Sequence, residues 1–264
     1  MDTNIIGQSI GNVGNAWRDE IARECIRRRL SPLLLTTIGM GLNVLGGILI
    51  GAGFAIQTSP NWLHLAAGII MLLAGALDLL DDMVARLSES VTKFAAFSDS
   101  VFDIYSDLAI FAGTLAYFAA RDSLGFVIVS AIAFGGVLVM RYTQARAESL
   151  LPGRYNAGYM RRPEWIVVVI VSCLLNRLQT GMALIAFFSN LAVFHRIWDT
   201  HQTAHNLEHP DEAGHGYGSL SAPAVTRFWR SVIFWTYPRQ SWQHDLLSLI
   251  MLLILILSVF LVPA

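Results

Sequence analysis

Residues 33–56 read LLLTTIGMGLNVLGGILIGAGFAI, a stretch of 24 residues without a charged side chain. Since about 20 apolar residues span the hydrocarbon core of a bilayer as an α-helix, this stretch predicts a transmembrane helix. The whole chain has the same character, because 55% of its 264 residues are hydrophobic and only 14% are charged. Soluble domains carry about a quarter charged residues. The sequence therefore predicts an all-α, polytopic membrane protein.

Further apolar segments predict the rest of the bundle. Residues 63–80 are apolar until Asp78, residues 95–120 are interrupted only by acids, and residues 124–140 carry no charge. Residues 164–198 are long enough to cross twice if the chain turns at residues 176–181. With residues 246–262 as a last apolar run, we predict a six-helix transmembrane bundle with an extra C-terminal span.

Four regions follow from this pattern. In residues 1–30, Trp17, Ile21 and Cys25 recur on one helical face, which is typical of an amphipathic juxtamembrane helix in the headgroup layer. Residues 31–200 would form the six-span bundle. Residues 201–245 are expected to form a polar cytoplasmic linker with an aromatic interfacial segment, and residues 246–264 the C-terminal transmembrane helix.

The distribution of basic residues supports the predicted spans. With a cytoplasmic N-terminus, 16 of the 18 arginine and lysine residues fall on the cytoplasmic side, and only Arg121 and Arg177 fall outside. This asymmetry is the one that the positive-inside rule predicts. The net charge of −1 gives no general attraction to nucleic acid, so we expect membrane lipid and no nucleic acid as a partner.

Acidic side chains gather where two predicted spans meet the cytoplasmic face. Asp78 and Asp81 share one helical face, and Asp99 and Asp103 share another. A helical hairpin would bring the two faces together, and four converging carboxylates need a cation to stay ionised. Solvated acids at helix ends are the less favoured alternative, because acids in a membrane are costly. Asp107 could pair with an arginine, line the pocket, or show a shifted register in which Asp103 and Asp107 replace Asp99 and Asp103.

Residues 78–103 resemble the motif of the CDP-alcohol phosphotransferase family, D-x-x-D-G-x-x-A-R, eight residues, G-x-x-x-D-x-x-x-D. The likeness extends over roughly residues 10–200 and implies a cytoplasmic active site in a bacterial or archaeal cell membrane, and a homodimer. Six of the eight fixed positions match at the right intervals, namely Asp78, Asp81, Ala85, Arg86, Asp99 and Asp103.

This resemblance implies a phosphatidyltransferase that moves a phosphatidyl group from CDP-diacylglycerol, or a similar CDP-linked lipid, to a small alcohol and releases CMP. Two Mg²⁺ or Mn²⁺ ions would hold the donor pyrophosphate on Asp78, Asp81 and Asp99. Asp103, also expected at the metal site, would deprotonate the acceptor hydroxyl, and Arg86 would lie near the nucleotide phosphates.

Two positions depart from the family motif. Asp82 and Ala95 stand where the family has glycine, against the expected nucleotide. Ala95 is a mild change, whereas Asp82 adds bulk and a negative charge. Asp82 could narrow nucleotide use, add a metal contact, or mark a member that has lost activity.

Residues 141–148, RYTQARAE, resemble the S-Y-x-[KR]-A-R-A-E segment of family members that use a phosphorylated acceptor, with Gln144 in place of a basic residue. Guanidinium groups suit phosphate oxygens, so we predict a cytoplasmic arginine cluster, joined by Arg196, that binds an acceptor such as a sugar phosphate. Plain positive-inside charge is the alternative, and an acceptor without phosphate stays open. The predicted pocket residues are Arg141, Arg146, Arg154, Arg161 and Arg162.

Two other function classes compete with this interpretation. An intramembrane prenyl-diphosphate transferase also uses acid-rich helices, but it usually needs more spans and lacks the Ala85-Arg86 spacing. The other class is a non-enzyme, either an inactive family member or an ion-handling protein. The released product separates these classes from the phosphatidyltransferase. A phosphatidyltransferase releases CMP, a prenyl-diphosphate transferase releases pyrophosphate, and a non-enzyme releases neither.

Overall fold

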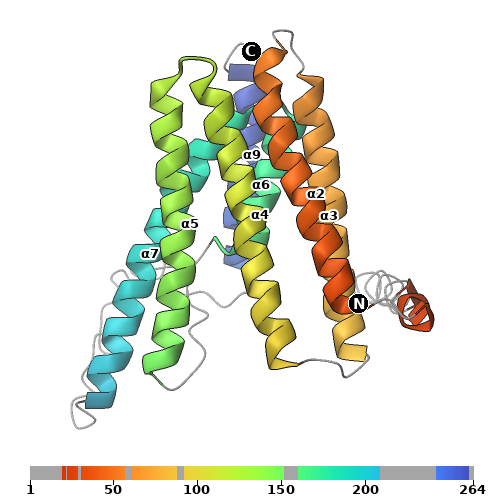
Figure 1. The fold of residues 1–264 in the computed structure, drawn as a ribbon. Helices are drawn as coiled ribbons and strands as arrows, with labels where there is room; N and C mark the ends of the chain where they lie inside the picture. The colour runs from red at the N-terminus through yellow and green to blue at the C-terminus, as the bar shows by residue number, and fades with distance from the viewer. Residues whose placement is uncertain are drawn as a thin grey trace, which may run out of the picture. The chain divides into compact units, whose positions relative to one another are not determined.

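The computed structural model describes residues 20–21, 23–28, 31–56, 61–87, 92–151, 160–208 and 242–261. In this part of the chain the regular structure is helical throughout, which confirms the predicted all-α fold (Figure 1). Residues 1–19 and 209–241, and with them most of the predicted interfacial helix and linker, lie outside the described residues. The helices form two compact units, Met1–Tyr117 and Phe118–Ala264.

Five described helices are long and apolar enough to cross a membrane. The short helix α6 (Arg162–Leu174) and the apolar residues Leu249–Phe260 of α9 (Trp242–Leu261) accompany them. The polytopic membrane fold is thus confirmed, with five to six helices able to span. The five long helices are α2 (Pro32–Ala52, extended by the short helix η1, Gly53–Ala55), α3 (Trp62–Leu87), α4 (Lys93–Ala119), α5 (Leu124–Leu150) and α7 (Leu178–Glu208).

The predicted turn between the fifth and sixth spans is shorter than the sequence suggests. Helix α6 ends at Leu174 and α7 already begins at Leu178, so most of residues 176–181 are helical. Asn176 carries the reversal with a left-handed φ of 54°, a conformation that asparagine adopts more readily than most residues. The 13 residues of α6 are too few to cross a bilayer alone.

In the first unit, α2 and α3 run antiparallel along a regular seam. Thr36 meets Asp81, and going up α2 the same seam brings Gly39 to Asp78, Gly46 to Met71 and Gly53 to His64. From one contact to the next, the residue number rises along α2 by as much as it falls along α3, which shows that the helices are antiparallel. The spacing of three and four residues is that of a coiled-coil seam. The buried seam residues include Thr36, Asn43, Ile50, His64, Ala67, Met71, Ala74 and Asp81.

Another face of α2 contacts α4 through glycines. A Cβ atom placed on Gly47 would lie 2.6 Å from the backbone carbon of Ala109, and a Cβ atom on Gly113 would overlap the Gly47 carbonyl. Farther up, Gly51 lies against Gly113 and Ala116. Because the contact advances on both helices together, α2 and α4 run parallel.

The first unit also includes the end of the N-terminal segment. Ser31 caps α2 by accepting a hydrogen bond from the Leu34 N–H at 3.2 Å. Before this cap, the helical residues 23–27 place Cys25 and Ile26 against the buried pair Leu35 and Val84. The end of this segment therefore packs beside the acid-bearing end of α3.

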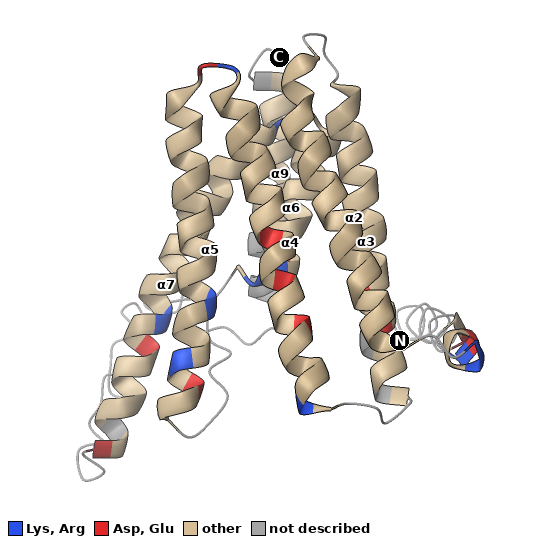
Figure 2. Cartoon of the chain, in the orientation of Figure 1, with Lys and Arg blue, Asp and Glu red and all other residues tan. Residues whose placement is uncertain are grey.

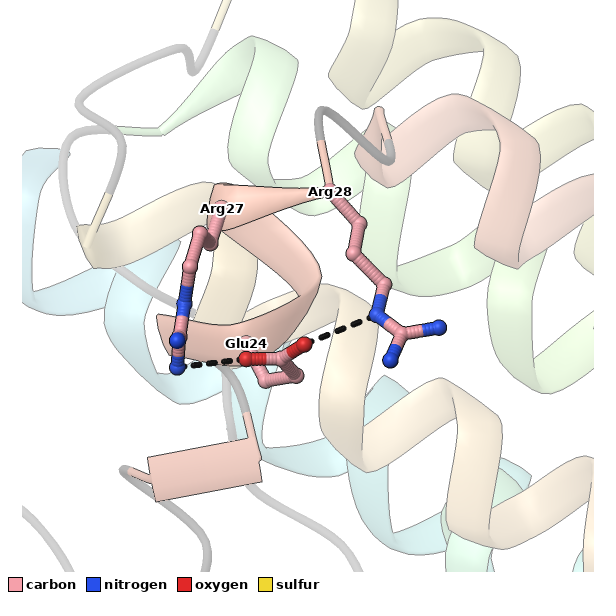
Figure 3. Close-up of polar contacts among 3 residues, drawn as sticks. All are labelled: Glu24, Arg27 and Arg28. Carbon is pink, nitrogen blue, oxygen red and sulfur yellow. Dashed lines mark hydrogen bonds and ion pairs between the residues drawn. The ribbon is translucent and has the colours of Figure 1, made fainter.

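Glu24 in this segment forms two ion pairs (Figure 3). Its carboxylate lies 2.5 Å from Arg27 Nη2 and 2.8 Å from Arg28 Nε. The hydrogen bond from Arg28 is the largest cause that holds the pKa of Glu24 below its ordinary value. The arginines expected at the membrane surface are thus partly neutralised within the segment itself.

In the second unit, α7 packs against α5 and α6 through small residues. Gly136 faces the Ser189 side chain, and Gly181 faces Ser172. Helix α9 packs on α6, and the two line an apolar pocket that includes Val167, Met251 and Leu255. Arg177 Nη2 donates a 3.0 Å hydrogen bond to the Val259 carbonyl near the end of α9. The extra C-terminal helix is therefore part of this unit.

Candidate active site

The two acids of α3 face α2. Asp81 is 8% exposed, and its Oδ2 accepts a 2.8 Å hydrogen bond from Thr36 Oγ1. Asp78 is half-buried, and its Oδ1 lies 2.9 Å from where a Cβ atom on Gly39 would stand. The shared face that the sequence spacing predicts is present. Asp78 and Asp81 occupy successive positions of the α2–α3 seam.

The acids of α4 follow one another up the helix. Asp99 is exposed, Asp103 is half-buried and Asp107 is fully buried. Asp103 lies six residues before the Ala109 contact with α2, and Gly39 lies eight residues before the Gly47 contact. At 1.5 Å per residue these offsets are about 9 Å and about 12 Å. Asp103 therefore lies at about the depth of Gly39, and so of Asp78.

Figure 2 shows the described acidic residues of α3 and α4 on two separate helices. Within the described ranges, no three Asp, Glu, His or Cys side chains lie close enough together to hold a metal ion. The structure therefore pairs Asp78 with Asp81 but does not gather them with Asp99 and Asp103. Like charges repel at short range, so carboxylates converge when a cation offsets their charge. All these donors are carboxylate oxygens, the ligands that Mg²⁺ and Mn²⁺ prefer.

Three further positions were expected beside the nucleotide. Asp82 and Arg86 belong to α3, but their side chains lie outside what the structure describes. Ala95 lies in the first turn of α4, where its N–H donates to Thr92 Oγ1 at 3.0 Å. Thr92 thus caps α4, and the Ala95 methyl replaces a family glycine in the capped turn.

The arginines expected around the acceptor belong to the second unit. Arg141 and Arg146 lie on α5, the first half-buried and the second exposed. Arg161 and Arg162 are half-buried at the start of α6, and Arg154 lies outside the described residues. The structure thus places four of the five predicted arginines on α5 or at the start of α6.

Arg196 of α7 is buried and donates hydrogen bonds to residues of α5. It is 1% exposed, and its Nη1 donates to the Met140 carbonyl at 2.5 Å and to Gln144 Oε1 at 3.3 Å. Gln144 Nε2 in turn donates to Glu148 Oε1 at 3.2 Å. Arg161 is near enough to act on Arg196 electrostatically. Gln144 thus links a buried cation to a carboxylate.

Sequence reasoning missed two residues that contact the acid pair, Thr36 and Gly39. Both lie in the charge-free stretch that defines the first span, where neither stands out from its neighbours. The available signal was their spacing of three residues, which equals the spacing of Asp78 and Asp81. The spacing becomes informative only when the antiparallel register of α2 and α3 is known, because the register pairs Thr36 with Asp81 and Gly39 with Asp78.

Comparison with known proteins identifies the class to which this fold and motif belong. The family model for CDP-alcohol phosphatidyltransferases matches residues 31–198. The archaetidylinositol phosphate synthase of Pyrococcus horikoshii is 28% identical over 170 residues, which cover 64% of this chain and 83% of that protein. The phosphatidylinositol phosphate synthase of Mycobacterium tuberculosis is 30% identical over 193 residues, which cover 67% and 84%.

Solved structures show the same likeness. The crystal structure of the Mycobacterium tuberculosis phosphatidylinositol phosphate synthase with CDP-DAG bound matches with a TM-score of 0.60 and 28% identity, over 69% of this chain and 92% of that chain. Its complex with manganese and citrate matches with the same TM-score and identity, over 69% of this chain and 88% of that chain.

The matched family region and the likeness to solved structures identify a membrane-embedded phosphotransfer enzyme. The chain belongs to the CDP-alcohol phosphatidyltransferase family. It is a metal-dependent transferase of phospholipid biosynthesis that moves a phosphatidyl group from a CDP-linked lipid to an alcohol. The predicted membership of this family is thus confirmed.

Proposed function

We propose that the chain transfers the phosphatidyl group of CDP-diacylglycerol to a small phosphorylated alcohol at the cytoplasmic face of the membrane and releases CMP. The acid motif in residues 78–103, inside the matched family region, carries this proposal. Relatives named as inositol phosphate lipid synthases support a phosphorylated acceptor. The distribution of basic residues supports a cytoplasmic N-terminus, and the resemblance supports a homodimer.

The acids would have two roles, metal binding and proton abstraction. Asp78, Asp81 and Asp99 would hold two Mg²⁺ or Mn²⁺ ions, which when bound offset the charge of the donor pyrophosphate. Asp103 of α4, at about the depth of Asp78, would take the proton from the acceptor hydroxyl. Because positioning and charge neutralisation dominate phosphoryl transfer, acids on rigid helices suit this chemistry.

The arginine cluster would hold the acceptor phosphate. Arg141 and Arg146 belong to α5, Arg161 is the N-cap of α6, and Arg162 is its first residue. Arg154 follows α5 in the sequence and lies outside the described residues. Guanidinium groups pair with phosphate oxygens in a bidentate manner, so several on one side of the membrane favour a phosphorylated acceptor over a neutral polyol.

The decisive experiment is CMP release from CDP-diacylglycerol by the purified chain in detergent with Mg²⁺. The acceptors are glycerol 3-phosphate, inositol 1-phosphate, inositol and serine. We expect CMP with a phosphorylated acceptor and a loss of about 10²–10⁴-fold in Asp103→Asn, the range for general base removal. Asp122→Asn is the matched control, because Asp122 is an exposed turn residue with a φ of 52° that asparagine also tolerates.

Other outcomes identify the alternatives. CMP with inositol or serine alone would overturn the phosphorylated acceptor and keep the transferase. Silence from a folded protein across the panel would contradict the donor or the activity itself. It would direct attention to Asp82, which adds a negative charge where the family has glycine.

A further inference from the structure

The acid pair of α3 lies in a helix–helix seam. Asp78 and Asp81 occupy the same series of positions as His64, Met71 and the other buried seam residues of α3. Residues at these positions normally pack against the partner helix. The side chains that α2 places opposite the two acids therefore control how the carboxylates stand.

Thr36 is the residue opposite Asp81. Its Oγ1 lies 2.8 Å from Asp81 Oδ2 and 3.0 Å from the Pro32 carbonyl oxygen. An ionised carboxylate accepts hydrogen bonds only, and a hydrogen bond to a charged acceptor is stronger than one to a neutral carbonyl. The hydroxyl proton therefore favours Asp81, and this bond fixes the position of one oxygen of its carboxylate.

Gly39 is the residue opposite Asp78. A Cβ atom there would stand 2.9 Å from Asp78 Oδ1, closer than real contacts allow, so a larger residue would push the carboxylate away. Gly41, two residues farther along α2, has open space around its Cα hydrogens. Of these two glycines, only Gly39 must lack a side chain to leave room for the Asp78 carboxylate.

We propose that Thr36 is a positioning residue for Asp81, and that Gly39 provides the space in which Asp78 stands beside it as a second divalent-cation ligand. The proposal rests on the proposed function, in which Asp78 and Asp81 ligate the metal. A hydrogen bond to one oxygen of a carboxylate ligand orients its other oxygen. Removal of such a partner typically lowers metal affinity by about 10–100-fold.

The test measures binding of Mn²⁺ to the purified full chain in detergent, from the electron paramagnetic resonance signal of free Mn²⁺. Thr36→Val keeps the shape and removes the hydroxyl, so we expect its Kd for Mn²⁺ to rise about 10–100-fold. Thr36→Ser should restore the wild-type Kd. Thr37→Val is the matched control, because Thr37 is exposed and its Oγ1 donates to the Leu33 carbonyl at 2.7 Å.

A second pair of variants tests Gly39 independently. Gly39→Ala should weaken Mn²⁺ binding, whereas Gly41→Ala should leave it unchanged. The thermal unfolding midpoint of each variant shows that it is folded, and the KM for CDP-diacylglycerol at saturating Mg²⁺ separates a metal effect from a general one. If Thr36→Val fails to fold, two results still test the proposal. They are the difference in Mn²⁺ affinity between Gly39→Ala and Gly41→Ala, and the wild-type Kd that is expected of Thr36→Ser.

The outcomes separate the two proposals. Wild-type Mn²⁺ affinity in folded Thr36→Val and Gly39→Ala would overturn the positioning role while the proposed function stands. Wild-type protein that binds Mn²⁺ but releases no CMP would overturn the proposed function, and the measured affinities would still decide the role of Thr36. Wild-type protein that binds no Mn²⁺ would overturn both.

Discussion

Gly47 of α2 and Gly113 of α4 bring the backbones of two parallel helices into direct contact, with no room for a side chain on either residue. Close approach of this kind between membrane helices relies on small residues. The contact fixes the depth of α4 relative to α2. It thereby sets Asp103 at about the level of Gly39 and Asp78.

Gly113→Ala should destabilise the protein, because the new methyl group would overlap the Gly47 carbonyl. Overpacking at a close contact typically costs about 1–3 kcal/mol, which thermal unfolding in detergent would show as a lower midpoint. Gly41→Ala is the control, because a Cβ atom on Gly41 of α2 would meet no atom outside its own stretch of helix within 4 Å. It should be neutral or stabilising by up to about 1 kcal/mol, since alanine suits a helix better than glycine. Equal midpoints for both variants would contradict the contact.

Asp82→Gly should lower the KM for CDP-diacylglycerol several-fold. The substitution removes bulk and a negative charge from the position expected against the donor nucleotide, whose phosphates are also negative, and like charges repel. Asp82→Asn separates charge from bulk and should show most of the same effect. If only Asp82→Gly releases CMP and the wild-type protein does not, the chain is an inactive family member.

Gln144→Lys should lower the KM for a phosphorylated acceptor and make it more sensitive to salt. The added ammonium would stand beside Arg196, and two cations can share one phosphate. Gln144→Met, which removes the hydrogen bonds to Arg196 and Glu148 without adding charge, should raise the same KM. The KM for the donor should not change in either variant. An unchanged acceptor KM in both would show that this network does not face the acceptor phosphate.

The N-terminal segment should loosen in acid. The pKa of Glu24 is lowered in the folded protein, so its ion pairs stabilise the segment above the ordinary pKa of a glutamate. This contribution is lost as the pH falls through the lowered folded value. Hydrogen exchange, corrected for the intrinsic pH effect, should therefore accelerate in residues 24–28 at low pH. Glu24→Gln should show the same acceleration at neutral pH, and an unaltered rate would contradict the prediction.

Arg177→Met should free the end of α9. This variant loses the 3.0 Å hydrogen bond to the Val259 carbonyl, one of the helix-terminal carbonyls that need an outside donor. Hydrogen exchange in residues 255–261 should accelerate. Arg121→Met, which changes an exposed arginine in another interhelical turn, should leave these residues unchanged.

The sequence predicted most of the spans and the acid pairs, because both depend on local spacing. A charge-free run of 24 residues needs a bilayer, and two acids three or four residues apart share a helical face. The position of the turn near Asn176 was predicted correctly, but the turn is shorter than the predicted residues 176–181. Helix α7 already begins at Leu178, before the apolar pattern of the sequence changes.

The partner of the acid face could not be predicted in the same way. The spacing of Asp78 and Asp81 fits a face turned toward either neighbour, and we expected it to meet the acids of α4. The structure turns it toward α2, where Thr36 accounts for one carboxylate oxygen. Likewise, Arg196 could be counted as one more cytoplasmic charge, but its contact with Gln144 depends on how α5 and α7 pack. Contacts between distant segments of the chain carry this information.

The common register of α2 and α3 makes these two helices inseparable in any exchange between relatives. A chimera that takes α3 with its acids but keeps a foreign α2 would place other side chains opposite Asp78 and Asp81. A single inserted residue in either helix between the Gly53–His64 contact and the Thr36–Asp81 contact would turn the acids off the seam by about 100°. Such grafts should be made as the whole hairpin, because the packing of Asp78 and Asp81 depends on both helices.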